Sequence, residues 1–303
     1  MAGSVPKGIL RDRLSDFKVC EVLDFEFADE GEHLYLQIEK TNLNTQDVQK
    51  LLAGHYGVDL VDVSYAGMKD KRAIARQWFS VRLPKTTQFL KHSNVVVLKE
   101  RRHTHKLRIG AHAANKFNIV VRETSSQGKS FAERAFARPF PNYFGSQRFG
   151  RNFRNLQRAC EWVTSARVRT SRAARSRHLS TLRSFIFNEV LAMRVCDGTW
   201  NSLICGDVQS LSSPTGPLWG RGSLPTAHRA RENEESIRSK HRETCDALEW
   251  VGLRHQRRAL SAQASDVEID GTDSTVSIGF TLPPGCYATV AIGECFELEE
   301  RLS

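Results

Sequence analysis

The sequence predicts an α+β protein in which a β-rich part of the chain is interrupted by a helix-rich part. Strand-like runs dominate up to Glu123, and helical patterns dominate from about Leu156. Strand character then returns at residues 275–285, where four apolar side chains alternate with small polar residues. This order is typical of one domain inserted into another. We expect the outer domain to cover residues 1–167 and 261–303, and the insertion to cover residues 168–260.

The early strands are predicted from runs of apolar and β-branched residues. They cover residues 16–27, 31–41, 61–67, 76–83, 94–100 and 117–123. In the second run, Leu34, Leu36 and Ile38 alternate with polar neighbours, which is typical of a half-buried strand.

Helices are predicted from apolar spacing and from capping residues. Over residues 44–57, Asn44 or Thr45 suits the first cap and Gly57 suits the end. Further helices are expected over residues 130–138, over 180–195 with Ser180 as the cap, and over 232–252. Residues 141–155 and 212–226 are rich in turn-forming residues and are expected to be loops.

The composition indicates a reduced, globular protein. The chain has 303 residues, of which 40% are hydrophobic, so it can build a sizeable core. No apolar run approaches the roughly 20 residues of a membrane span, and the first residues lack the apolar core of a signal peptide. Seven cysteines without a C-x-x-C pair argue against a disulfide framework and a cysteine zinc site. We expect a cytoplasmic protein.

The net charge of +10 favours a polyanionic partner such as nucleic acid. Ten arginines lie between Arg148 and Arg183, with one acidic residue, Glu161, and no lysine. Arginine binds phosphate oxygens with two donors and stacks on bases. The interleaved Phe149, Phe153 and Trp162 favour RNA contact over a merely solvated basic face.

A Lys-Asp-Lys-Arg turn lies between two strand-like runs, in the stretch YAGMKDKRAIARQW at residues 65–78. Nearby cations lower the pKa of a carboxylate by about 1–3 units. Asp70 is therefore expected to be ionised, which suits a nucleophile and not a general acid. The alternative is an exposed hairpin tip without a chemical role.

The stretch PNYFGSQRFGRNFRN at residues 141–155 combines aromatic rings with amides and arginines. Amides can hydrogen-bond the edge of a base, and a ring can stack on its face. The alternative is that these rings fill the core.

Together, YAGMKDKRAIARQW and PNYFGSQRFG resemble the two signature motifs of the TruD family of tRNA pseudouridine synthases. Supporting resemblances run nearly end to end and include DFKVCEV, GEHLYLQIEKTNLNT, RSFIFNEVLAMRV, PLWGRG and FTLPPGCYATVAIGE. The resemblance implies an isomerase that converts a D-stem uridine, at tRNA position 13, to pseudouridine. It also implies a pseudouridine-synthase catalytic domain with a mixed, largely antiparallel sheet, interrupted by an inserted TRUD-type α/β domain.

The resemblance implies roles for individual residues. Asp70 falls on the nucleophile, and the substrate-binding positions fall on Phe17, Asn142, Phe144 and Tyr287. A carboxylate can attack either C1′ of the ribose or C6 of the uracil, and the sequence leaves both open. The candidates for RNA binding are Arg11, Lys69, Arg148, Arg151 and Arg154, and among them Arg11 and Arg148 are candidate cationic partners of Asp70.

The chain also departs from the family pattern, at RNFRN (residues 151–155) and at Gly293. These departures motivate an alternative, a catalytically impaired tRNA-binding protein or RNA chaperone. An RNA hydrolase has no histidine pair or metal cluster to support it, and His103 and His105 lack a carboxylate or cysteine companion for a metal. We expect a monomer with a tRNA substrate, no membrane association, no metal and no cofactor.

Overall fold

The computed structural model describes residues 5–83, 90–165, 170–209, 211 and 213–301. Its packing divides the chain into two compact units. The first comprises Met1–Ala137, Ala264–Gly285 and Cys295–Ser303, and the second comprises Arg138–Gln263 and Cys286–Glu294. The domain boundaries expected from the sequence, at residues 167 and 260, stay a prediction.

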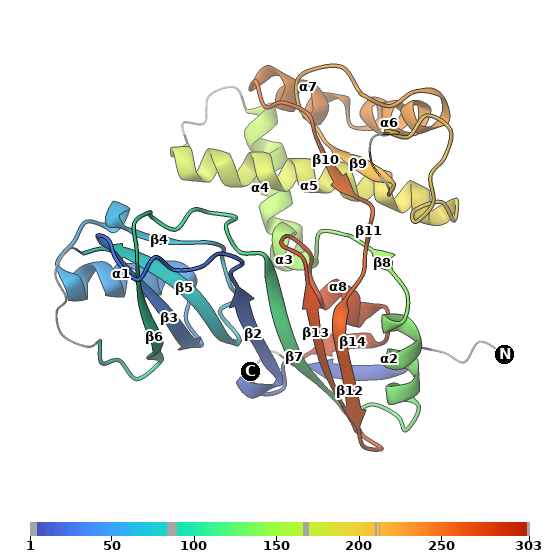
Figure 1. The fold of residues 1–303 in the computed structure, drawn as a ribbon. Coiled ribbons are helices and arrows are strands. Elements are labelled where there is room, and N and C mark those ends of the chain that lie inside the picture. The colour runs from blue at the N-terminus through green and yellow to red at the C-terminus, as the bar shows by residue number, and fades with distance from the viewer. Residues whose placement is uncertain (1–4, 84–89, 166–169, 210, 212, 302–303) are drawn as a thin grey trace. The chain divides into compact units, whose positions relative to one another are not determined.

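A large sheet forms the first unit, and among the described residues it contains ten strands (Figure 1). The main order is β12-β13-β7-β2-β5-β3-β6, while β1 pairs with β14 and β7, and β4 pairs with β5. The strands are β1 (Lys7–Leu10), β2 (Phe17–Val22), β3 (His33–Thr41), β4 (Val63–Tyr65), β5 (Ile74–Arg82), β6 (Val95–His103), β7 (Ala114–Arg122), β12 (Ser265–Gly271), β13 (Thr275–Leu282) and β14 (Glu297–Glu300).

The sheet is mixed and largely antiparallel, as predicted. Among the described strand pairs, only β1–β14 and β2–β5 are parallel. In the second of these pairs, Lys18 lies opposite Ile74. Parallel strands begin at the same edge of a sheet. The residues just before β5, including Asp70, are therefore brought to the edge at which β2 begins with Phe17.

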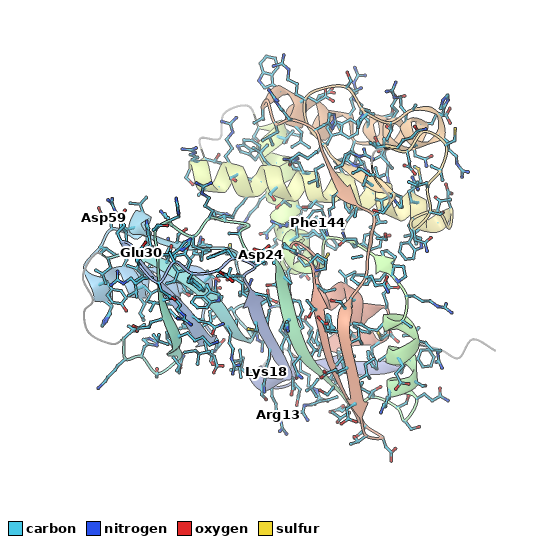
Figure 2. The ribbon with its side chains drawn as sticks, in the orientation of Figure 1. Arg13, Lys18, Asp24, Glu30, Asp59 and Phe144 are labelled. Carbon is cyan, nitrogen blue, oxygen red and sulfur yellow. The ribbon has the colours of Figure 1, made fainter. Side chains whose placement is uncertain are left out.

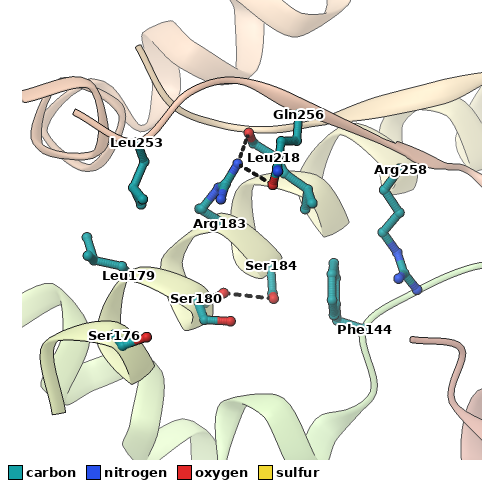
Figure 3. A pocket seen from close by; sticks show the side chains of 10 residues that line it. All are labelled: Phe144, Ser176, Leu179, Ser180, Arg183, Ser184, Leu218, Leu253, Gln256 and Arg258. Carbon is teal, nitrogen blue, oxygen red and sulfur yellow. Dashed lines mark hydrogen bonds between the residues drawn. The ribbon is translucent and has the colours of Figure 1, made fainter. Parts of the chain in front are cut away.

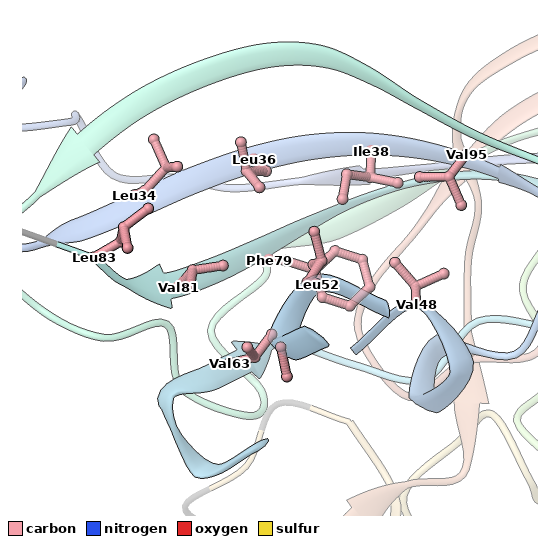
Figure 4. Close-up of a cluster of buried hydrophobic side chains, with 11 residues drawn as sticks. Leu34, Leu36, Ile38, Val48, Leu52, Val63, Phe79, Val81, Leu83 and Val95 are labelled. Carbon is pink, nitrogen blue, oxygen red and sulfur yellow. The ribbon is translucent and has the colours of Figure 1, made fainter. Parts of the chain in front are cut away.

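The core of the first unit lies between the sheet and α1 (Thr45–Tyr56) (Figure 4). Val48 and Leu52 of α1 pack with apolar side chains of β3, β5 and β6. Asn44 and Gly57 flank α1 as predicted, and Gly57 adopts a left-handed φ of 65° that ends the helix. The helix α2 (Gly128–Phe136) is also confirmed, and its Phe136 ring lies 4.9 Å from that of Phe280 on β13. Short 3₁₀ helices cover Leu14–Asp16 and Leu60–Asp62.

Helices dominate the second unit, as the sequence predicted for this part of the chain. They are α3 (Ser146–Phe149), α4 (Arg154–Thr164), α5 (Arg172–Cys196), α6 (His228–Lys240), α7 (Arg242–Trp250) and α8 (Ala288–Gly293), with a 3₁₀ turn at Arg151–Phe153. The strands β9 (Thr215–Leu218) and β10 (Gln256–Ala259) pair with each other, and β8 (Phe140–Pro141) pairs with β11 (Ser261–Ala262). Leu182, Ile186 and Val190 of α5 pack against Trp219 and α7. Within the described ranges, no helix combines the length and the apolar character needed to cross a membrane.

Four sequence predictions in this unit are wrong in detail. The expected loop at 141–155 contains α3, a 3₁₀ turn and the start of α4. Ser180 does not cap its helix, because α5 begins at Arg172 and the Ser171 hydroxyl accepts a hydrogen bond from the Ala174 amide at 3.2 Å. The charged run at 232–252 forms two helices, separated at His241. The expected loop at 212–226 contains β9, whose pairing partner lies about 40 residues later along the chain.

Candidate active site

In the first unit, the Asp70 carboxylate is paired with an arginine. Arg11 Nη2 lies 2.6 Å from Asp70 Oδ2, and Arg11 Nη1 lies 2.9 Å from Glu300 Oε1 on β14. Asp70 exposes 34% of its side chain, whereas Arg11 exposes 9%. One arginine therefore bridges two carboxylates. Of these, Asp70 is the residue that the sequence suggested as the nucleophile.

An aromatic ring lies directly beside this pair. The guanidinium carbon of Arg11 is 4.2 Å from the ring centroid of Phe17. Such a contact attracts the cation to the ring face and fixes its orientation. Arg11 itself has a left-handed φ of 60°, which is uncommon for a residue with a side chain. Arg11, Phe17 and Asp70 thus form one cluster at the edge where β2 and β5 begin.

A buried lysine holds the backbone of Asp70. Lys40 is fully buried on β3, and its ammonium group donates to the carbonyl oxygens of Asp70 and Leu43, each at 2.7 Å. Burial lowers the pKa of Lys40 to about 8, although the charge on Asp70 opposes this shift. By donating to both carbonyl oxygens, Lys40 fixes the backbone of the turn that carries Asp70.

The residues just before Asp70 are fixed in the same way. Thr45 Oγ1 accepts from the Lys69 amide at 2.9 Å, and Gln77 Nε2 donates to the Gly67 carbonyl at 3.1 Å. Lys69 Nζ lies 2.8 Å from Glu21 Oε1, whose side chain is fully buried. The turn is therefore tied to the sheet at several points, and Asp70 is not the tip of a free hairpin.

Lys69 takes part in a buried ion pair, although the sequence suggested it for RNA binding. Its side chain is 6% exposed, and Nζ also donates to Asn115 Oδ1 at 2.8 Å. The second oxygen of Glu21 accepts from the Trp78 amide at 3.0 Å. This arrangement gives Lys69 a positioning role for the Asp70 turn, and its contact with RNA stays a prediction.

In the second unit, Asn142 is buried and fully engaged. Its Nδ2 donates to the Ala259 carbonyl at 2.9 Å, and its Oδ1 accepts from Arg258 Nη2 at 2.6 Å. Its backbone amide donates to the Leu260 carbonyl at 2.8 Å. These bonds join the segment after β8 to β10, and they place Arg258 beside the predicted substrate-binding segment.

Phe144 is labelled in Figure 2, and its ring has arginines and other rings around it. The guanidinium carbon of Arg258 is 4.2 Å from its centroid, and that of Arg148 is 5.7 Å away. Phe187 and Tyr287 approach edge-on, with centroids at 5.4 and 6.0 Å. The ring is half-buried, and its contacts with Arg148, Arg258, Phe187 and Tyr287 fix its position.

The backbone of Phe144 is held by one amide side chain. Asn188 of α5 accepts from the Phe144 amide and donates to its carbonyl, both at 2.9 Å. The next residue, Gly145, passes so close to Tyr287 that a Cβ there would lie 2.9 Å from Tyr287 Cδ1. A side chain at position 145 would therefore push this ring away from Phe144.

Arg148 links Tyr287 to helix α5. Its Nε donates to the Tyr287 hydroxyl at 3.2 Å, and its Nη1 donates to Ser180 Oγ at 3.2 Å. Asn142, Phe144, Arg148 and Tyr287, which the sequence suggested as site residues, thus lie in one connected cluster.

Several of the other arginines in the Arg148–Arg183 window are exposed. They include Arg151, Arg154, Arg158, Arg172, Arg175 and Arg177, while Arg167 and Arg169 lie outside the described residues. Phe153, between the first two, has 60% of its surface exposed and a left-handed φ of 58°. An exposed ring between arginines is a surface that suits RNA.

The sequence did not reveal four residues of these two clusters: Lys40, Glu21, Asn188 and Arg258. Lys40 and Glu21 carry a weak signal, because each is a charged residue in a strand-like run. Asn188 is a polar residue in the apolar part of a predicted helix. Arg258 lies in a basic stretch that alone gives no indication of a partner.

The chain is similar to known proteins along nearly its whole length. The family profile for tRNA pseudouridine synthase D (TruD) matches residues 4–171. The tRNA pseudouridine synthases D of Pseudomonas fluorescens (strain Pf0-1) and Pseudomonas syringae pv. syringae (strain B728a) are each 36% identical to this chain. Both alignments cover 96% of this chain, with 91% and 92% of the respective relatives. A crystal structure from Methanosarcina mazei assigned to tRNA pseudouridine synthase D superposes with a TM-score of 0.67. It covers 98% of this chain and 95% of that one at 18% identity, so the fold is shared.

These matches define the class of the protein, which is a pseudouridine synthase and therefore an isomerase. More narrowly, the chain belongs to the tRNA pseudouridine synthase D (TruD) family. The family resemblance of the two motifs is thereby confirmed, and so is the mixed α+β fold.

Proposed function

We propose that this chain isomerises a D-stem uridine of tRNA, at position 13, to pseudouridine, with Asp70 as the nucleophile. The observation that carries the proposal is the partly exposed Asp70 carboxylate, paired with Arg11 at 2.6 Å on a turn fixed by buried polar groups. The Asp70 carboxylate is ion-paired and 34% exposed, so a substrate can reach it, while the bond from Lys40 holds the backbone of Asp70 in place.

The proposed reaction exchanges one bond of the ribose for another. Asp70 forms a transient covalent bond with the uridine, and the bond between C1′ and N1 breaks. The uracil turns over, C1′ bonds to C5, and the bond to Asp70 breaks, which frees the carboxylate. The proton on C5 is lost and N1 gains a proton. Arg11 holds the Asp70 carboxylate in position for attack. No electrons are gained or lost and no phosphate is transferred, so we propose no cofactor and no metal.

The aromatic and amide residues are proposed to bind the substrate. Phe144 supplies a ring face, and Tyr287 supports it from the side at 6.0 Å. Phe17 is 2% exposed and its ring contacts the Arg11 guanidinium, so we propose that it acts on the substrate through Arg11. Asn142 orders the segment on which Phe144 lies through its bonds to Ala259 and Arg258. A ring against the detached uracil would limit both its escape and its attack by water.

The arginines are proposed to bind the tRNA backbone. Arg148, Arg151 and Arg154 belong to the window that carries most of the excess positive charge. Flipping a base out of its stack costs a few kcal/mol, and phosphate contacts can offset that cost. We propose a monomeric cytoplasmic enzyme whose catalytic domain carries an inserted TRUD-type domain.

The test is single-turnover isomerisation of a tRNA transcript with excess Asp70→Asn protein. We expect no pseudouridine, with tRNA binding within about threefold of wild type, because only the nucleophile is lost. Asp59→Asn, a change of an exposed carboxylate in the same unit, is the matched control and should react normally. A transcript with cytidine at position 13 tests the position.

Two outcomes would overturn the proposal. Normal turnover by folded Asp70→Asn protein would exclude Asp70 as the nucleophile. Tight tRNA binding by wild type without any product, even under excess enzyme, would favour the alternative of an RNA chaperone.

A further inference from the structure

A pocket of about 390 Å³ lies within the second unit, beside Phe144 (Figure 3). Its walls come from helix α5, from the end of β9 and from residues 253–258. The volume lies in the range of roughly 300–1,000 Å³ that is typical of small-molecule sites. The pocket is therefore large enough for one nucleotide.

The pocket is lined by two arginines, and the described residues around it include no acidic side chain. Arg183 and Arg258 contribute the positive charge. Burial lowers the pKa of each, because a charged guanidinium is poorly solvated there. A bound anion would restore the interactions that burial removes, and so it would be favoured in this pocket.

Arg183 retains a donor for such an anion. Its Nη2 donates to the carbonyls of Leu218 and Arg254, at 2.8 and 3.0 Å, and to Gln256 Oε1 at 3.3 Å. These acceptors are all neutral, and among the described residues the buried Nε has no hydrogen-bond partner. Leaving a buried donor unpaired is unfavourable, so an anion that accepts hydrogen bonds from this guanidinium is expected to bind.

Hydroxyl groups follow one side of the pocket. Ser176, Ser180 and Ser184 are spaced by four residues, so they share one face of α5. Ser184 donates to the Ser180 carbonyl at 2.8 Å, whereas the Ser180 oxygen accepts from Arg148 at 3.2 Å. The Ser180 hydroxyl proton and the Ser176 hydroxyl can therefore donate to a ligand. Leu179, Leu218 and Leu253 provide the apolar part of the wall.

From these features we propose that the pocket binds one nucleotide of the RNA, a neighbour of the target uridine, through its phosphate. The Arg183 guanidinium and the hydroxyls of Ser176 and Ser180 donate to the phosphate, and the leucines contact the attached nucleoside. This proposal rests on the proposed function, because Phe144 lines the pocket and is also proposed to contact the target.

The experiment uses D-arm RNAs, each of which carries one uncharged methylphosphonate linkage at a different position. Dissociation constants are measured with the full-length wild type and with Arg183→Gln. We expect Arg183→Gln to raise Kd about tenfold for unmodified RNA. We also expect the two changes to be coupled at a single linkage. There the methylphosphonate weakens RNA binding by the wild type but does not further weaken RNA binding by Arg183→Gln.

Arg242→Gln is the matched control, because Arg242 lies in the same unit but outside the Arg148–Arg183 window, and 79% of its side chain is exposed. This variant removes the same charge without changing the pocket. Its effect on the free energy of RNA binding should therefore add to the effect of each methylphosphonate, whatever the position of the linkage. If Arg183→Gln is also additive at all positions, the pocket does not bind a phosphate and the proposal is wrong.

Arg183→Gln also removes hydrogen bonds that support the fold, so a second variant that keeps Arg183 is needed. Ser176→Phe fills the mouth of the pocket from an exposed position and changes no charge. We expect KM for the RNA to rise about tenfold with kcat within about twofold. Unchanged KM and Kd in this variant would also overturn the pocket proposal. If wild type binds with the predicted coupling but makes no pseudouridine, the proposed function fails and the pocket stands.

Discussion

The residue with the clearest dependence on distant parts of the chain is Asp70. The sequence surrounds it with cations, but the structure pairs two of these with other carboxylates. Arg76 lies 2.7 Å from Glu39, and Lys69 lies 2.8 Å from Glu21. The arginine at Asp70 comes from position 11, which the family resemblance suggested as one of two partners and which local composition alone could not predict. It follows from the arrangement of β1, β2 and β5.

Arg11→Gln tests this pairing. We expect kcat to fall about 100-fold, because the variant removes a fixed charge beside the carboxylate that we propose reacts. Single-turnover rates measure the effect. Arg13→Gln is the control, since Arg13 is close in sequence and 68% exposed. Equal losses in both variants would contradict a specific role for Arg11.

Lys40 leads to a prediction about pH. Its pKa in the folded protein is about 8, below its usual value of 10.5, so the unfolded chain binds more protons between these values. The free energy of unfolding should therefore rise with pH from about 8 to 10.5, by about 3 kcal/mol at most from this residue.

Lys40→Met should remove this part of the pH dependence and also lower kcat, because the Asp70 carbonyl loses its donor. Urea unfolding of both proteins at several pH values measures the difference. An identical pH dependence in the two proteins would show that Lys40 is not the titrating group.

At the scale of elements, α5 positions Phe144 through one polar residue. Asn188→Ala leaves the amide and carbonyl of Phe144 without this partner, so we expect the unfolding free energy to fall by about 2 kcal/mol. KM for tRNA should rise as well, since the ring loses its support. Thermal unfolding and steady-state kinetics measure the two effects. Asn201→Ala, in an exposed turn, should change neither.

The elements that could be predicted are those with local signals. Asn44 and Gly57 delimit α1 because capping and a left-handed end are properties of a few adjacent residues. The start of α5 was missed because its first turns carry exposed arginines in place of an apolar face. The short strands β1, β9 and β14 depend on distant partners, so their own residues give little indication of them.

The residues of the candidate site also fall into two groups, those with a local sequence signal and those that depend on distant partners. Phe17, Asp70, Asn142, Phe144 and Tyr287 came from motifs, and their roles stay predictions. The residues that hold them, such as Lys40 and Asn188, act through hydrogen bonds between segments far apart in the sequence. Their function as supports is visible only once those segments are folded.

At the scale of the whole molecule, the net charge of +10 predicts a strong dependence of RNA binding on salt. If about six to ten phosphates are contacted, affinity should fall about 10³–10⁵-fold between 50 and 200 mM salt. Replacement of Arg151, Arg154 and Arg158 by glutamine should reduce the slope of log Kd against log salt by about 1 for each lost contact.

The same charge change at Arg229, Arg231 and Arg242, which are exposed in the second unit, is the control and should leave the slope nearly unchanged. Filter binding over a salt series measures both. Equal slopes for the two triple variants would mean that overall charge, and not the Arg148–Arg183 window, sets the affinity.

The parallel pairing of β1 with β14 has a consequence for the order of synthesis. Arg11 follows the first of these strands, and Glu300, which accepts its second hydrogen bond, closes the other. A ribosome makes β1 long before β14, so the growing chain holds Asp70 and Arg11 without the acid that shares the guanidinium. The reactivity proposed for Asp70 should therefore reach its final level only after β14 has left the exit tunnel.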